Sequence, residues 1–409
     1  MGKIVFNKKN NYYIDSFFLF LFFQPFLLFN ISTAYFSIFY FLISSLVYNG
    51  LIIKKTIWFF WCLILLHLIC MCLYYQSLNY SLTLLIKFGS AIFIAGYLYK
   101  KYKTIYDSLL TIALASVYHY VIIILQIMAP AFRNAWFSFV INSGIEKLPE
   151  SVYNEIPLRA NGVNGFLFAE DGAIFAFSFI FLFFYKRTTN DGLFRKLYYS
   201  ICQILSILLA LISGRTSLVV ILLNLHVVFC SFKLSKKIVF ILTVSFAIAA
   251  VSLFIFETSP ELFNWLYEPI NNIFSGKPIS GSTSDTIQNH LYWLKDISSN
   301  LLGYGIFSFE QSDYDVYGIH QSDSGYVRLL VSGGVIQVFL FLLPSLYMFF
   351  YTLPKLRKTD KLLSTLYLDF LFFSCLFTFK SFFLFSGYYW VVSICFYLYS
   401  CPPNRKLTQ

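Results

Sequence analysis

The residues of this sequence with the clearest capacity for chemistry are arginines that border long apolar segments. They are Arg133, Arg159, Arg215 and Arg328. A guanidinium group offers a planar fork that binds two phosphate oxygens at once, and it keeps its charge in a low-dielectric setting where a lysine can lose its proton. This choice of residue favours a site for a phosphate or pyrophosphate group.

Arg215 lies between two apolar segments, 197–212 and 218–232. The first rises only about 24 Å at 1.5 Å per residue if it is helical, and the second is no longer. We therefore expect the turn at 213–217 to lie within the membrane, where an arginine is costly and usually functional. The alternative interpretation is that Arg215 extends to the lipid headgroups and has no further role.

His320 and Asp323 are spaced three residues apart, which places them on one face if the segment is helical. An imidazole or a carboxylate at that place could take a proton from a hydroxyl group. The alternative is that Asp323 or Ser324 caps the following helix and His320 lies in water. The residues alone leave both readings open.

The remaining ionisable residues of the apolar segments are weaker candidates. They are Lys87, Asp369, His67, His119 and His226, which we interpret as interface or packing residues. Glu170 and Asp171 begin an apolar segment, so we favour helix-terminus charges over a base. No compact cluster of carboxylates or histidines has the spacing of metal ligands, so we expect neither a metal nor a cofactor.

The elements that must position these residues follow from composition. Of 409 residues, 58% are hydrophobic and only 12% are charged, about half the charged fraction usual in soluble domains. Apolar stretches of roughly 15 to 25 residues recur between short basic clusters, and this length suits a bilayer core of about 30 Å. Backbone groups in lipid must be satisfied within each segment, so the sequence predicts helices rather than a barrel.

The sequence predicts an all-α, polytopic membrane protein that forms a single membrane domain over 1–409. The expected spans are 14–30, 32–53, 56–75, 81–99, 108–129, 166–185, 197–212, 218–232, 238–256, 326–353, 362–379 and 381–400. This gives about 12 transmembrane helices, and the even number places both termini on one side of the membrane. The eight cysteines show no disulfide framework or zinc spacing and are interpreted as packing residues.

Orientation follows from the basic residues, because cytoplasmic loops retain lysine and arginine during insertion. Most of the 30 lie at the N-terminus, the C-terminus and in alternate connections, for example Lys54, Lys100, Arg187 and Lys358. Both termini are therefore expected in the cytoplasm. The net charge of +11 is then a topology signal, and it does not indicate a nucleic-acid partner.

Two long loops are expected on the outer side, at 130–165 and 257–325. Long loops are common places for functional residues. Within the second loop, 286–297 has apolar residues at helical spacing, which predicts an amphipathic helix on the membrane surface. The stretch 263–273 could be another. Together these helices would cover a cavity at the outer interface.

Four segments, taken in order, resemble the O-antigen polymerase and ligase superfamily. They are the segments 159–173, 213–217, 301–305 and 322–336. The first three contain the motifs Arg159-Ala160-Asn161-Gly162, Ser213-Gly214-Arg215 and Gly303-Tyr304-Gly305, and the fourth is a re-entering segment with Tyr326 and Arg328. The resemblance covers roughly residues 155–345. Ligases of this superfamily carry His-Asn or a similar pair where this chain has Asp323-Ser324, and His320 lies three residues too early. The Asp-Ser-Gly-Tyr form is similar to the polymerase branch.

The resemblance implies a glycosyltransferase of lipopolysaccharide or capsule-like polysaccharide biosynthesis at the periplasmic face of a bacterial inner membrane, with both long loops periplasmic. Its substrates would be oligosaccharide repeat units linked to undecaprenyl pyrophosphate, with no cofactor, and a chain-length regulator protein is an open partner. Arg159, Arg215 and Arg328 would bind the pyrophosphate. Arg215, His320 and Asp323 would be catalytic.

Two alternative functions remain open from sequence. One is an O-antigen ligase that moves the glycan to lipid A-core. The other is a flippase or transporter of lipid-linked oligosaccharide, although the internal repeats expected of many transporters are not clear here.

Overall fold

The structure is a computed structural model, and it describes most of the chain. The described residues are 11–28, 31–47, 55–75, 81–142, 168–213, 216–258, 260–276, 291, 293–294, 297–305, 324–379, 381 and 383–401. They are almost entirely helical, so the predicted all-α class is confirmed. They fall into two compact units, Met1–Ile43 with Tyr102–Leu266, and Ser44–Lys101 with Tyr267–Gln409. The single membrane domain expected over 1–409 stays a prediction.

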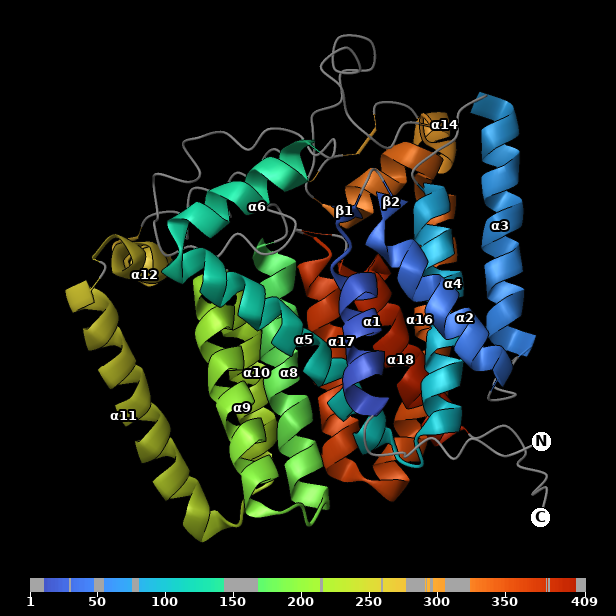
Figure 1. Cartoon of the computed structure of the whole chain (residues 1–409). Helices are drawn as coiled ribbons and strands as arrows, with labels where there is room; N and C mark the ends of the chain where they lie inside the picture. Colours follow the sequence, from blue (N-terminus) through green and yellow to red (C-terminus); the bar gives the residue numbers. More distant parts are fainter. Residues whose placement is uncertain are drawn as a thin grey trace, which may run out of the picture. The chain divides into compact units, whose positions relative to one another are not determined.

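The first unit has α5, α9 and α10 packed around α8 (Figure 1). Its helices are α1 (Asn11–Phe23), α5 (Ile105–Met128), α6 (Pro130–Asn142), α8 (Phe168–Thr188), α9 (Leu193–Ser213), α10 (Thr216–Cys230) and α11 (Leu234–Thr258). α2 (Thr33–Val47) and α12 (Pro260–Phe274) contain the points where the chain passes between units. α8 packs against α5, α9 and α10, and it is buried on nearly all faces because it is apolar all round.

Polar side chains link the helices of the first unit in its interior. Ser116 of α5 and Ser178 of α8 lie 2.7 Å apart, and Tyr120 of α5 lies 2.5 Å from the hydroxyl of Ser206 in α9. The side chain of Asn224 in α10 donates to the carbonyl of Ala176 in α8. Such bonds between helices are typical of membrane bundles, where apolar packing alone gives little specificity.

Helix α1 ends seven residues earlier than the span 14–30 predicted. Pro25 lacks an amide hydrogen and disfavours helical geometry at Gln24, so the helix stops at Phe23. The chain then forms two antiparallel strands, β1 (Leu27–Leu28) and β2 (Ile31–Ser32). They are closed by the amide of Thr33, which donates to the carbonyl of Phe26 at 2.9 Å.

The second unit contains α3 (Lys55–Tyr75), α4 (Ser81–Lys101), α14 (Ile297–Leu302), α16 (Gly325–Thr359), α17 (Lys361–Phe377), the short 3₁₀ helix η2 (Phe383–Phe385) and α18 (Gly387–Ser400). α18 is its most buried helix and packs against α4 and α16. It begins at Gly387, not at 381 as predicted. The reason is that Ser386 caps it by accepting the amide of Tyr389 at 3.2 Å.

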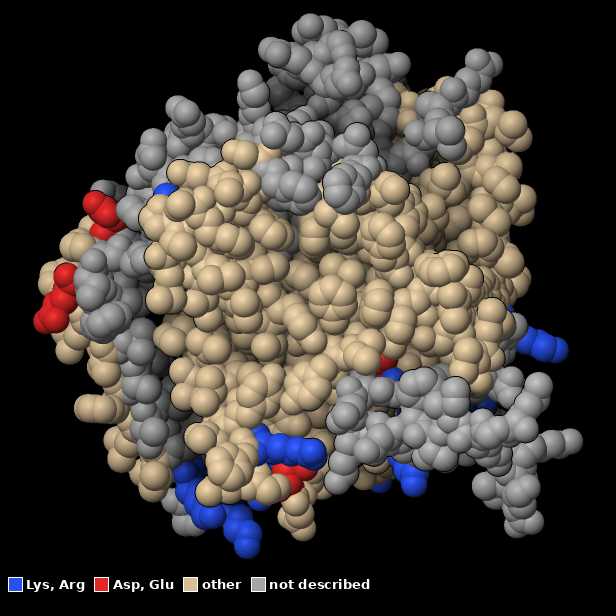
Figure 2. Space-filling view, viewed as in Figure 1, with Lys and Arg blue, Asp and Glu red and all other residues tan. Residues whose placement is uncertain are grey.

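Among the described residues, five helices are long and apolar enough to cross a membrane: α3, α4, α5, α9 and α16. Many large apolar side chains on helix surfaces are exposed, such as Leu73 and Phe246. Figure 2 shows helix surfaces that are almost free of charged atoms, with lysine and arginine at helix ends. The chain therefore has the features of a membrane protein.

Two predictions about short helices had different outcomes. The stretch 263–273 lies in helix α12, as expected. The prediction of a helix over 286–297 is wrong in its second half, because Leu291, Trp293 and Leu294 are not helical. Helix α6, within the segment predicted to be a long loop, was not anticipated.

Candidate functional site

Four of the five predicted site residues lie outside the described residues. They are Arg159, Arg215, His320 and Asp323. The fifth, Arg328, lies in the first turns of α16 and is half-buried. The described residues next to these positions show which helices the four segments contact. The segments 159–173 and 213–217 belong to the first unit, and 301–305 and 322–336 belong to the second.

The connection that carries Arg215 is bounded by two buried serines. Ser213 at the end of α9 donates its hydroxyl to the carbonyl of Leu209 at 2.7 Å. Ser217 in the first turn of α10 donates to the carbonyl of Ala210. Both hydroxyls thus bind the backbone of α9, and the second bond joins the start of α10 to the end of α9.

One premise about this connection was wrong. α9 spans 21 residues, Leu193–Ser213, rather than 16, because it begins four residues earlier and ends one residue later than predicted. At 1.5 Å per residue it is about 31 Å long, enough to cross a bilayer core. α10, with 15 residues, is short as predicted. The length argument for placing this connection inside the membrane therefore holds only for α10.

The start of α8 packs tightly against the same connection. A methyl group added at Gly172 would lie 3.1 Å from Cβ of Ser217, 3.3 Å from the carbonyl oxygen of Ala210 and 3.5 Å from Cβ of Ser213. A glycine at this position permits the close approach of the three helices. The start of α8 thus meets the end of α9 and the start of α10 at Gly172, Ser213 and Ser217.

Next to Gly172 lies a buried polar cluster from three helices: Gln24 directly after α1, His119 in α5 and Asp171 in α8. Their side chains are 3%, 1% and 2% exposed. The Gln24 amide nitrogen donates to Oδ1 of Asp171. His119 Nε2 lies 3.7 Å from Oδ2 of Asp171. A buried carboxylate in such a helix bundle is costly and marks a candidate functional site.

The sequence reading of this cluster was incomplete. Asp171 does lie in the first turn of α8, where a carboxylate is stabilised by the helix N-terminus. Gln24 was not singled out at all, and His119 was read only as a packing residue. Its ring does pack, at 4.9 Å from the ring of Phe175, while Nε2 faces the carboxylate. The signal available in the sequence was a polar residue, Gln24, that interrupts an apolar run directly before Pro25.

In the second unit, the re-entering helix α16 is fixed at its start. Ser324 caps it by accepting the amide of Val327 at 3.5 Å, so of the two capping residues considered Ser324 does cap the helix. The amide of Gly325 donates to the carbonyls of Thr378 at 2.9 Å and Ser381 at 3.1 Å. Tyr326 donates its hydroxyl to the carbonyl of Cys375 at 3.1 Å. The end of α17 therefore holds the first turn of α16.

Helix α16 is broken at Gly333 and Gly334, and the Gly303-Tyr304-Gly305 segment fills the break. The two glycines have non-helical backbone angles, with φ of +70° at Gly334. The amide of Tyr304 donates to the carbonyl of Val331 at 2.6 Å, and that of Gly305 to the carbonyl of Ser332 at 3.2 Å. These bonds satisfy carbonyls that the break releases from the helix.

Only glycine fits at this contact. A methyl group added at Gly303, whose φ is +73°, would lie 2.6 Å from the backbone nitrogen of Gly333. Tyr75 of α3 donates its hydroxyl to the Gly303 carbonyl at 2.7 Å and adds a third helix to the contact. The Gly-x-Gly segment of the sequence analysis is thus a backbone-to-backbone contact that fixes α16.

An apolar cavity of about 350 Å³ lies beside the first turns of α16. It is lined by Leu291, Trp293, Tyr326, Val327, Leu330, Val335, Val338 and Phe379. Arg328 follows the lining residue Val327 in the chain. A cavity of this size and lining can hold a hydrocarbon segment.

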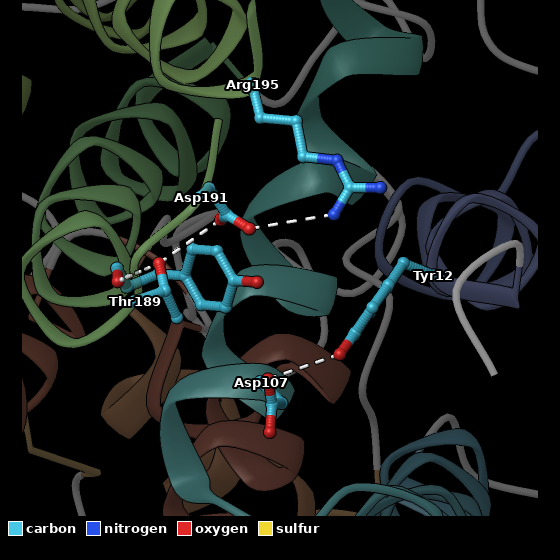
Figure 3. A network of polar contacts seen from close by, with 6 residues as sticks. Tyr12, Asp107, Thr189, Asp191 and Arg195 are labelled. Atoms are coloured by element: carbon cyan, nitrogen blue, oxygen red, sulfur yellow. Dashed lines mark hydrogen bonds and ion pairs between the residues drawn. The ribbon is translucent and has the colours of Figure 1, made fainter. Parts of the chain in front are cut away.

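Further polar contacts lie near the end of α8 and the starts of α5 and α9 (Figure 3). Asp171 lies at the other end of α8. Tyr12 donates to Asp107 at 3.2 Å, Thr189 donates to Asp191 at 3.2 Å, and Arg195 lies 3.6 Å from Asp191. Nearby in α1, the fully buried Asp15 accepts from Tyr40 at 2.7 Å and Tyr102 at 2.5 Å. These bonds anchor α1 to α2 and to the residues before α5.

No family model and no curated protein matches the chain. Among the described residues, no three histidine, cysteine, aspartate or glutamate side chains lie together as a metal site would require. The functional argument therefore rests on the residues and contacts of this chain.

Proposed function

We propose that this protein polymerises glycan repeat units linked to undecaprenyl pyrophosphate, as a glycosyltransferase at the periplasmic face of the bacterial inner membrane. In this proposal about twelve helices cross the membrane, both termini are cytoplasmic, and the two long loops are periplasmic. The product is an O-antigen or a capsule-like polysaccharide.

One observation supports the proposal: described residues of the four segments that resemble the O-antigen polymerase superfamily are in contact in two pairs. In the first unit, the segment from Arg159 to Ala173 meets the connection 213–217 through Gly172. In the second, Gly303-Tyr304-Gly305 binds the backbone of the segment 322–336 at Val331 and Ser332. Segments that are far apart in the sequence thus support one another, which favours a shared function over four chance matches.

The proposed reaction is a single glycosyl transfer. A hydroxyl of the acceptor repeat unit attacks the anomeric carbon of the donor chain, the bond from that carbon to the pyrophosphate oxygen breaks, and undecaprenyl pyrophosphate leaves. The hydroxyl proton goes to His320 or Asp323. Arg159, Arg215 and Arg328 stabilise the negative charge that builds on the pyrophosphate.

The cavity beside α16 suits the lipid part of such a substrate. Its lining is apolar, and Arg328 follows one lining residue directly in the chain. A lipid pyrophosphate combines a hydrocarbon chain with a strongly anionic group. The apolar cavity suits the first part, and in this proposal Arg328, in the same helix, binds the second.

The test is elongation of a defined lipid-linked repeat unit by the purified protein in detergent. We expect products of several repeat units together with released undecaprenyl pyrophosphate. Transfer of the glycan only when lipid A-core is supplied would instead identify a ligase. A protein that gives no product with either acceptor, but moves the lipid-linked repeat across a vesicle membrane, would be a flippase, and the proposal would be wrong.

A further inference from the structure

The side chains of Gln24 and Asp171 face each other in the interior of the first unit. The amide nitrogen of Gln24 donates to Oδ1 of Asp171, and both side chains are almost fully buried. The same amide carries an oxygen, Oε1, that is also buried and that accepts no hydrogen bond from any described residue. An amide oxygen buried without a donor is costly, so the pair needs one more donor at this place.

A proton on Asp171 would be that donor. A carboxylic acid and a primary amide can form two hydrogen bonds in one ring, because the amide N–H donates to one carboxyl oxygen while the acid O–H donates to the amide oxygen. The first of these bonds is present between Gln24 and Asp171. The second becomes possible when Oδ2 carries a proton. The protonated acid can therefore satisfy Oε1 of Gln24, whereas the charged form leaves it without a donor in this pair.

An ion pair with His119 accounts less well for the same contacts. Nε2 of His119 lies 3.7 Å from Oδ2 of Asp171, which is longer than a hydrogen bond. The imidazole ring packs edge-on against Phe175, with 4.9 Å between the ring centres, and this is an apolar setting in which an imidazolium is costly. A proton on His119 would also do nothing for Oε1 of Gln24. The contacts therefore favour a proton on Asp171 beside a neutral His119.

The other groups around Asp171 either act in the same direction or have a weaker effect. Glu170, its neighbour in α8, is a second acidic group, and two negative charges at one place oppose each other. The start of α8 favours a carboxylate, but that effect is small compared with the hydration lost on full burial. α9 and α10 meet α8 at Gly172 through Ser213 and Ser217, which do not titrate. Among the described residues, no lysine or arginine forms an ion pair with Asp171.

We propose that Asp171 is a proton-binding site, whose carboxyl group holds a proton at neutral pH, donates that O–H to Oε1 of Gln24, and releases the proton through His119. On release the O–H bond at Oδ2 breaks and an N–H bond forms at Nε2 of His119, 3.7 Å away. Aspartate and histidine side chains carry protons in this way inside the helix bundles of pumps and transporters. The inference goes beyond the proposed function and does not depend on it, because it rests on the contacts of α1, α5 and α8 alone.

The test is infrared spectroscopy of the purified full-length protein in detergent. A protonated carboxyl group gives a C=O stretching band that a carboxylate lacks, and this band moves when water is replaced by heavy water. We expect such a band at neutral pH. It should move when the aspartates carry a heavy-carbon label that leaves Glu170 unlabelled, and it should be absent from Asp171→Asn. Absence of the band from the parental protein, or its persistence at full intensity in Asp171→Asn, overturns the proposal.

Asp15 is a matched control, because it is also fully buried in the first unit but accepts hydrogen bonds from the hydroxyls of Tyr40 and Tyr102. Hydroxyl donors bind the charged form, so Asp15→Asn should leave the band unchanged. Gln24→Met keeps Asp171 and gives a result even if Asp171→Asn folds poorly. Its band should lie at higher frequency, because the C=O group loses the amide donor. A band at the parental frequency in Gln24→Met would contradict the pairing with Gln24.

The role of His119 is tested by the rate at which the acid proton exchanges. After transfer to heavy water, the band should move with time as deuterium replaces the proton. His119→Phe keeps an aromatic ring beside Phe175, so the band should remain, but its movement should slow roughly a hundredfold because the proton has lost a positioned acceptor. Exchange at the parental rate in His119→Phe would mean that the proton leaves by another path, and would overturn the release through His119.

Discussion

Arg215 is where the chemistry of a single residue type matters most. We expect Arg215→Lys to elongate nearly as slowly as Arg215→Ala. A lysine keeps the charge but lacks the planar fork, so it binds a leaving pyrophosphate less firmly in the transition state. The loss should be about a hundredfold, or about 3 kcal/mol of transition-state stabilisation. The measurement is the elongation rate, normalised to the amount of each variant in the membrane.

The control for this comparison is Lys277→Ala, which removes a positive charge from the second long loop and should be almost silent. Arg215→Lys at the parental rate would mean that the residue only extends to the headgroups. The pyrophosphate would then have to be bound by Arg159 or Arg328.

The effect of replacing glycine can be compared at two positions that share a left-handed backbone conformation but differ in their surroundings. Gly303 has φ of +73° and contacts the backbone of Gly333, whereas Gly276 has φ of +65° and has nothing within 4 Å of an added methyl group. Gly276→Ala should lower the free energy of unfolding by about 1 kcal/mol through backbone strain alone. Gly303→Ala should cost about 3 kcal/mol or more, because strain and overlap add.

Thermal unfolding in detergent measures this difference. If both variants lose the same stability, the contact of Gly303 with the α16 break contributes nothing, and the Gly-x-Gly segment would owe its glycines to turn geometry only.

At the scale of the element, the sequence predicted where helices exist better than where they end. α3 and α4 begin within one residue of the predicted positions. Lys54 and Lys55 mark the start of α3, and the polar residues Gln76, Ser77 and Asn79 precede the start of α4. α1 was predicted too long because hydropathy stays high across Pro25 and beyond. α18 was predicted too early because the apolar residues Phe383–Phe385 form η2 instead of joining the helix.

The break in α16 was invisible to the same reasoning. Gly333 and Gly334 sit within a continuous apolar stretch, so a hydropathy window sees one long span. What breaks the helix is the insertion of a segment about 30 residues earlier, Gly303-Tyr304-Gly305, which donates to its carbonyls. Such a partner is a tertiary effect, and the paired glycines were the only local signal.

The attachment of α1 gives a prediction at this scale. Asp15 is fully buried and accepts from Tyr40 of α2 and from Tyr102. We expect Tyr102→Phe to lower the free energy of unfolding by about 2 kcal/mol, because a buried carboxylate loses a donor that nothing replaces.

The measurement is thermal unfolding in detergent, and Tyr35→Phe, at an exposed tyrosine of the same α2 helix as Tyr40, is the control that should change little. Tyr40→Phe should resemble Tyr102→Phe. If Tyr102→Phe and Tyr40→Phe are both as stable as Tyr35→Phe, then apolar packing holds α1 in place and the hydrogen bonds of Asp15 do not.

At the scale of the whole molecule, the sequence indicated a membrane protein, and its arginine-centred site stays a prediction. It did not indicate the cluster of Gln24, His119 and Asp171. Gln24 and Asp171 lie 147 residues apart in the chain. No spacing rule connects residues at such separations, because their contact depends on how α1, α5 and α8 pack. The polar residues of a bundle therefore become interpretable only once their helices are assembled.

Each unit nevertheless shows a consistent separation of charge along its helices. In the first unit, basic residues lie where α8 ends, α9 begins and α11 begins: Lys186, Arg187, Arg195, Lys196, Lys236 and Lys237. In the second, they lie where α4 ends, α16 ends and α17 begins: Lys100, Lys101, Arg357, Lys358 and Lys361. Basic residues stay on the cytoplasmic side during insertion, so these ends should all be cytoplasmic.

Reporter fusions test this topology. Alkaline phosphatase fused after Ser280 should be active, because it folds only outside the cytoplasm, whereas a fusion after Asn190, between α8 and α9, should be inactive. A fluorescent protein that matures only in the cytoplasm should give the reverse pattern at both positions. If the Ser280 fusion is inactive and the fluorescent fusion there is bright, the second long loop faces the cytoplasm. Arg328 and the α16 cavity would then open to the wrong side for a periplasmic lipid-linked glycan, and a polymerase at that face would be excluded whatever the variants of Arg215 showed.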